Sequence, residues 1–157
     1  MTEVRKGSCA CGEVRYEVAG EPMFVHCCHC RECQCHSGSA FVINAIVETA
    51  QIRQLSGELQ AISVPTRSGS PHDIHHCGTC QTALWSDYGQ LAGMRFLRVG
   101  TLEVPAEMPP DVHIFTRSKL PWVILPETVP AYSVYYDFND IWPAASVARR
   151  RKATGQG

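Results

Sequence analysis

The chain has 157 residues, of which 45% are hydrophobic and 18% charged, so its size and composition suit a single folded domain with its own core. A formal net charge of -1 argues against a nucleic-acid-binding surface, and no stretch approaches the roughly 18 apolar residues of a membrane span. The beginning, MTEVRKGSCACGEV, contains no apolar segment typical of a signal peptide, so we expect a cytoplasmic protein that binds neither nucleic acid nor membrane.

The apolar residues recur mainly with period two, which is typical of strands. Strands are expected around Val14, Tyr16 and Val18, and then over residues 41–47, 60–64, 74–77, 82–86, 94–99 and 112–115. Turn-forming residues separate these runs, for example at 20–22, 56–58, 68–71 and 108–111. Many short strands at this spacing favour an antiparallel, mainly β architecture.

Helical signals are few. Residues 116–122 predict a turn or a short tight helix, and residues 140–145, with Pro143 in the first turn, predict the start of a short terminal helix. The basic run at 149–152 predicts a frayed, solvated end, with a phosphate- or partner-binding arm as the alternative. We therefore expect one domain over residues 1–140 and a C-terminal extension over 141–157, a short helix followed by a disordered basic tail.

The chain contains nine cysteines, and an odd number fits poorly with a complete disulfide framework. Cysteines paired two to four residues apart on tight turns are typical of zinc sites. Two such pairs, Cys9 with Cys11 and Cys77 with Cys80, supply the four thiolates of a closed, structural zinc site. A redox role for the second pair is the alternative, but no βαβ pattern surrounds it.

Cys28, Cys30 and Cys33 remain as a C-x-C-x-x-C triplet within the stretch HCCHCRECQCH. Three ligands leave one tetrahedral corner free for water or substrate, as in a catalytic zinc site. Cys35 is the alternative fourth ligand that would close the site, although an uninvolved buried thiol is the favoured interpretation. We expect Cys27 to behave as a small buried hydrophobic side chain.

The histidines are ambiguous. His29, between two expected ligands, is predicted to turn outward, and no role is assigned to His26 or His36. A second set could carry protons in a reaction, although a structural role is more common for each of its members: His75, His76, His113 and Asp87.

Six segments occur in a characteristic order: residues 7–18 (GSCACGEVRYEV), 28–33 (CHCREC), 37–41 (SGSAF), 77–80 (CGTC), 100–102 (GTL) and 113–122 (HIFTRSKLPW). Through them the chain resembles the family of glutathione-dependent formaldehyde-activating enzymes, also called the GFA or centromere-protein-V domain family. The resemblance implies a mainly β, Mss4-like fold of several small antiparallel sheets stapled by zinc. It also implies two Zn²⁺ per chain, a structural ion at the four paired cysteines and a catalytic ion at the triplet.

The family's named activity is the condensation of formaldehyde with glutathione to S-hydroxymethylglutathione, formally a carbon–sulfur lyase reaction. The resemblance therefore implies an enzyme of this type, with a small thiol or aldehyde substrate such as glutathione as its partner. A non-catalytic binding module with two structural metals and a redox or metal-buffer protein are the alternatives. The chain is expected to be a monomer or a homodimer.

Substrate contacts are expected from residues near the triplet and in the 113–122 segment. Ser37, Gly38 and Ser39 could place hydroxyls or backbone amides near a substrate, with a plain turn as the alternative. Arg117 and Lys119 could pair with substrate carboxylates, or be solvated charges. Trp122 could line a pocket, although a core position is favoured.

Two departures from the family pattern stand close to the expected metal sites. Gln81 occupies a position where the family usually has glycine, which affects the geometry of the turn. Gln34, Cys35 and His36 stand where the family often has a pair of basic residues, beside the triplet.

Overall fold

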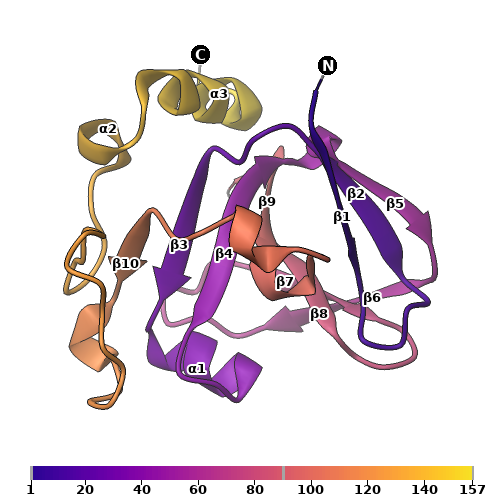
Figure 1. Ribbon diagram of the computed structural model, residues 1–157, viewed down its shortest axis with the longest axis horizontal. Helices are drawn as coiled ribbons and strands as arrows, with labels where there is room; N and C mark the ends of the chain where they lie inside the picture. The colour runs from indigo at the N-terminus through magenta and orange to yellow at the C-terminus, as the bar shows by residue number, and fades with distance from the viewer. Residues whose placement is uncertain (1, 90, 157) are drawn as a thin grey trace.

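The computed structural model describes residues 2–89 and 91–156, and this part of the chain is mainly β (Figure 1). The strands are β1 Val4–Ser8, β2 Arg15–Ala19, β3 Phe24–Cys28, β4 Val42–Glu48, β5 Ile52–Ser56, β6 Leu59–Val64, β7 His72–Cys77, β8 Ala83–Tyr88, β9 Met94–Arg98 and β10 Val112–Ile114. The α-helices are α1 Arg31–Ser37, α2 Phe138–Ile141 and α3 Ala144–Thr154, and the 3-10 helices are η1 Thr49–Gln51, η2 Val99–Thr101, η3 Pro105–Glu107 and η4 Thr116–Ser118. None of the helices in these described ranges is long and apolar enough to cross a membrane.

The strands form two sheets. The smaller has the order β1-β2-β5, and the larger has the order β10-β3-β4-β9-β8-β7-β6. Figure 1 shows the smaller sheet on the right and β10 beside β3 on the left, with α1 below the ends of β3 and β4. The mainly β class with few helices is thus confirmed. The parallel pairing of β10 with β3 was not among the sequence predictions, which were of antiparallel strands.

The first core lies against the small sheet. The alternation of Val14, Tyr16 and Val18 places all three side chains inward, each fully buried. The ring of Tyr16 meets that of Trp85 edge-on, with centroids 5.5 Å apart. Gly7 lies opposite Tyr16 on β1, where a Cβ atom would come within 2.3 Å of the Tyr16 ring or hydroxyl, so only glycine fits.

The second core joins β3 and β10 to the C-terminal helices. Phe24 stacks on Trp142 with ring centroids 5.3 Å apart. Arg149 of α3 donates to both carboxylate oxygens of Glu48 at 2.8 and 2.6 Å. The predicted disordered basic tail is therefore wrong, because residues 149–152 belong to a helix that these contacts hold against the sheets.

Two segments next to the cysteine triplet also differ from the sequence expectation. β3 was not predicted, because every one of its residues is buried and the strand has no alternating polar face. The short helix α1 was not predicted either, because its N-cap is Cys30, whose Sγ accepts from Cys33 N, in place of the usual serine, threonine or aspartate. The tight helix expected within residues 116–122 is present as η4.

Candidate functional site

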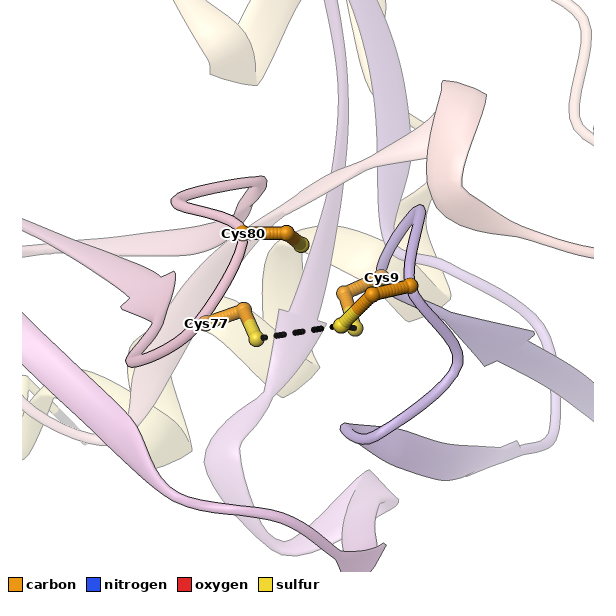
Figure 2. Close-up of side chains that lie close together, drawn as sticks. Cys9, Cys77 and Cys80 are labelled. Atoms are coloured by element: carbon orange, nitrogen blue, oxygen red, sulfur yellow. Dashed lines mark hydrogen bonds between the residues drawn. The ribbon is translucent and has the colours of Figure 1, made fainter.

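Four cysteines meet between two turns. Cys9 and Cys11 lie in the turn from β1 to β2, and Cys77 and Cys80 lie at the turn from β7 to β8. Their Sγ atoms all fall within 4.8 Å of one another, with 3.4 Å between Cys9 and Cys11 and 3.8 Å between Cys11 and Cys77. Figure 2 shows Cys77 and Cys80 on one turn facing Cys9 on the other. Sulfurs bound to one tetrahedral zinc are about 3.8 Å apart, so this group could hold a zinc ion.

Backbone and hydroxyl groups donate hydrogen bonds to the sulfurs of this group and so favour the thiolate form that binds a cation. Val14 N donates to Cys9 Sγ at 3.3 Å. The hydroxyl of Thr82, followed by backbone donors, lowers the pKa of the Cys80 thiol to about 5. Ala10 N donates to the same hydroxyl oxygen at 3.1 Å and so ties the two turns together. A thiol held as thiolate before metal arrives needs less rearrangement to bind it.

The triplet is built by the end of β3 and the start of α1. Cys28 ends the strand, Cys30 caps the helix, and Cys33 lies in its first turn, so their three Sγ atoms fall within 4.8 Å of one another. Cys33 N donates to Cys30 Sγ at 3.3 Å. Hydrogen bonds from Cys28 and Cys33 lower the pKa of Cys30 strongly, and the hydrogen bond with Cys30 raises the pKa of Cys28. The group therefore favours negative charge at Cys30.

A partly buried cation lies near the triplet. Burial lowers the pKa of Arg98, and the nearby Cys33 thiol acts in the opposite direction by attracting the positive charge. Arg98 Nη1 donates to Asn44 Oδ1 at 2.7 Å, which fixes the guanidinium. This cation offsets part of the charge that three thiolates would bring.

The triplet opens on a cavity of about 500 Å³, a size typical of small-molecule sites. Apolar side chains, including Leu91, Phe96 and Ile114, form much of its wall. Its charged groups come from different segments: Arg31 and Glu32 from α1, Arg67 from the loop after β6, and Arg117 from η4. Three cations against one carboxylate make this cavity attractive to an anionic ligand.

Of the residues predicted to contact substrate, only Arg117 lines this cavity. Gly38 and Ser39 line a separate hollow, together with Trp122, and Ser37 donates to Cys33 O at 2.7 Å within α1. Lys119 Nζ donates to the carbonyls of Leu120 and Val123, at 3.2 and 2.6 Å.

Other expectations for single residues differ from the structure. The favoured core position for Trp122 is wrong, because its side chain is 70% exposed. His29 does not turn outward, since it is fully buried. Cys35 is exposed on α1, outside the triplet group, where a buried thiol had been favoured. Cys27 is buried as expected.

The predicted proton carriers lie away from the cavity wall. His75 Nε2 is 2.8 Å from Asp87 Oδ2, and this pair is joined by Arg95. His76 Nδ1 lies 3.1 Å from Ile74 O, and His113 is buried beside β3. None of the four predicted carriers is among the residues that line the cavity in the described ranges.

The cavity contains histidines and aromatic residues that the sequence did not single out as site residues. His72 of β7 lines it, stacks on Tyr88 with centroids 4.1 Å apart, and is 5% exposed. Its Nε2 has no hydrogen-bond partner in the described parts of the chain, and burial lowers its pKa to about 4. His26 and Tyr135 also line the cavity. No local signal in the sequence identifies these residues. The pairing of the strands brings His72 and His26 to the triplet, and the chain that follows β10 brings Tyr135 there.

Comparisons with known proteins agree with this fold. Residues 4–118 match the family model described as "Glutathione-dependent formaldehyde-activating enzyme". A Halomonas elongata protein named "Putative glutathione-dependent formaldehyde-activating enzyme" is 27% identical over 123 residues, which cover 75% of this chain and 78% of that protein. A crystal structure of a Rhodobacter sphaeroides protein is similar with a TM-score of 0.50 and 20% identity, covering 81% of this chain and 99% of the other. This last likeness concerns the fold alone.

Proposed function

Because the chain belongs to the glutathione-dependent formaldehyde-activating enzyme family, we propose that it is a zinc-dependent enzyme of the carbon–sulfur lyase type. Its substrate would be a thiol–aldehyde adduct such as S-hydroxymethylglutathione, which it forms or cleaves. One observation carries this proposal: a group of three thiols, Cys28, Cys30 and Cys33, faces a cavity large enough for a small molecule. The exposed position of Cys35 supports three protein ligands at this site.

The donor sets fit zinc at two places. Cys9, Cys11, Cys77 and Cys80 would hold a structural ion with four sulfurs, and the triplet would hold a second ion with three, giving two ions per chain. When bound at an open site, Zn²⁺ makes a coordinated thiol more acidic or polarises a carbonyl.

The reaction is an addition that requires no oxidant. The thiol sulfur attacks the aldehyde carbon, a C–S bond forms, and the π bond of the carbonyl breaks. The thiol loses one proton and the former carbonyl oxygen gains one, so the step balances. Cleavage of the adduct is the reverse.

His72 is the proposed carrier of that proton. Its imidazole lies in the cavity wall, and its Nε2 has no hydrogen-bond partner in the described parts of the chain. Because burial lowers its pKa to about 4, it is neutral near pH 7 and would hold the proton only transiently. The stacked ring of Tyr88 fixes its orientation. Arg117, with Arg31 and Arg67, would pair with carboxylates of a thiol such as glutathione. The apolar wall would reduce access of water.

The test measures the rate of formaldehyde loss in the presence of glutathione, after subtraction of the uncatalysed rate. We expect native protein to accelerate the loss and Cys30→Ser to retain at most about 1% of that acceleration, because it removes a metal ligand. Cys35→Ser is the matched control in the same stretch and should stay within about twofold of native. Equal rates for native protein and Cys30→Ser would remove the proposal for this substrate.

A further inference from the structure

A third group of metal-binding side chains lies next to the triplet and outside the cavity. Cys27, His29 and His113 are all buried, and their ligand atoms fall within 4.8 Å of one another. Cys27 Sγ is 3.6 Å from His29 Nε2, which is 3.0 Å from His113 Nδ1. The proposed catalytic chemistry uses none of these three groups.

The pairing of β3 with β10 creates this group. Cys27 and His29 are two residues apart on an extended segment, so they share one face while Cys28 and Cys30 take the other. β10 runs parallel to β3 with His113 opposite Cys27. His29 N donates to Ile114 O at 3.0 Å, which continues this pairing one residue beyond the strand. Three potential ligands, one thiol and two imidazoles, therefore meet on one face of two paired strands.

Hydrogen bonds among these three side chains do not satisfy them all. In a neutral imidazole, His29 Nε2 is either a donor or an acceptor, yet it faces both the Cys27 thiol and His113 Nδ1. If it donates to His113, it cannot accept from the thiol. If it accepts, the thiol and the ring of His113 compete for one lone pair. A cation at the centre would instead use lone pairs from all three groups at once.

We propose that Cys27 Sγ, His29 Nε2 and His113 Nδ1 bind a third divalent transition metal ion, for which Zn²⁺ is the probe. In a tetrahedral zinc site with these donors, sulfur and nitrogen are about 3.6 Å apart and two nitrogens about 3.3 Å apart. The observed separations of 3.6 and 3.0 Å are close to these values. One thiolate and two imidazoles form a donor set of borderline softness, which suits zinc. Binding releases the Cys27 thiol proton to solvent and clamps β10 to β3 beside the triplet.

Zinc content per chain tests this site. Native protein and variants are equilibrated with the same buffered free Zn²⁺, desalted and measured by elemental analysis. We expect Cys27→Ser and His113→Gln each to contain one zinc fewer than native protein. Cys35→Ser, which changes an exposed cysteine in the same stretch, should match native protein. Cys30→Ser should lose a different ion, so the double variant with Cys27→Ser should lose two.

Equal zinc content in native protein and in folded Cys27→Ser and His113→Gln would overturn the third site and leave a buried, hydrogen-bonded trio. If both variants fail to fold, cobalt titration of native protein decides. Saturation at three equivalents of Co²⁺ per chain, one for each cysteine-containing group, supports the site. Saturation at two equivalents overturns it. The formaldehyde test with Cys30→Ser is independent of this count, so either proposal can fail alone.

Discussion

At the scale of single residues, Gln81 has a backbone conformation that favours glycine. Its φ is +61°, in the left-handed region, directly after Cys80. A residue with a Cβ atom in this conformation destabilises the fold by about 1–2 kcal/mol relative to glycine. Glycine would recover only part of this, because its greater freedom in the unfolded chain favours unfolding. The sequence departure noted at this position is therefore a source of strain in the turn that carries Cys77 and Cys80, two of the proposed zinc ligands.

We expect Gln81→Gly to raise the free energy of unfolding of the zinc-loaded protein by roughly 0.5–1 kcal/mol, because it relieves this strain. Denaturant unfolding at fixed free zinc measures the change. Gln81→Ala is the control: it removes the exposed hydrogen bond from Gln81 Nε2 to Gly78 O but keeps the Cβ atom, so it should gain nothing. A less stable glycine variant would contradict the prediction.

His72 gives a second prediction at this scale. His72→Gln should lower kcat for adduct formation or cleavage by about 100-fold, since it removes the proposed proton carrier. Its KM and zinc content should stay close to native. His76→Gln, on the same strand but outside the cavity lining, should leave kcat within about twofold. An unchanged kcat in His72→Gln would exclude this histidine as the carrier.

At the scale of elements, one ion pair joins α3 to β4. Arg149 contacts both Glu48 oxygens, and its Nη2 also donates to Glu21 O at 2.9 Å and Gln51 Oε1 at 3.0 Å. Burial alone would raise the pKa of Glu48. The hydrogen bond from Arg149, a backbone hydrogen bond and the positive charges of Arg149 and Lys152 together outweigh burial and lower that pKa. The folded protein therefore favours the charged carboxylate, and the pair supports the helix only while Glu48 is ionised.

Arg149→Ala should reduce the free energy of unfolding by roughly 1 kcal/mol at pH 7, because both partners remain partly exposed. The unfolded carboxyl titrates near 4.5, and the folded one below that value. The difference between native and variant should thus be complete above about pH 5 and shrink as the pH falls through the folded pKa. Urea unfolding of native protein and variant at pH 7 and near pH 4 measures the difference in unfolding free energy at each pH. Arg151→Ala, an exposed residue on the same helix, should show a smaller loss at pH 7. A difference that grows on acidification would contradict the assignment.

The elements also show which features a sequence reveals. A strand with one buried face, such as β2, follows from alternation, and C-x-C and C-x-x-C spacing predicts which cysteines can share an ion. β3 and α1 were missed because one is buried throughout and the other has an unusual cap. His72 could not be identified as a cavity residue from the sequence, because its position depends on the register of β7 with β8. Lys119 and Trp122 were misplaced because nothing local reveals how the chain leaves η4.

At the scale of the whole molecule, the four-cysteine group connects segments that are distant in the chain. Cys11 and Cys77 are 66 residues apart and join the small sheet to the large one. A metal clip across so long a loop removes much of the freedom of the unfolded chain, and metal affinity adds directly to folding free energy.

Removal of zinc by a strong chelator should therefore lower Tm by about 10 °C or more, as expected from a loss of several kcal/mol in a protein of this size. Scanning calorimetry with and without chelator measures the shift. Cys9→Ser should start from a lower Tm and respond less to chelator than Cys35→Ser, whose exposed thiol lies outside all three groups. A Tm unaffected by chelator would mean that the two sheets are held together without metal.

The match to the family ends at residue 118, but Tyr135 forms part of the cavity wall, and Tyr136 beside it accepts a hydrogen bond from Trp142 at 2.6 Å. Tyr136 also contacts His26 of β3, so the returning chain is anchored to the strand that leads to the triplet. Tyr135 thus adds a piece of wall from beyond the family match, while the other residues that line the cavity in the described ranges lie within residues 4–118. Substitutions at Tyr135 and at the residues that anchor it could therefore reshape that side of the cavity, while Cys28, Cys30 and Cys33 stay unchanged.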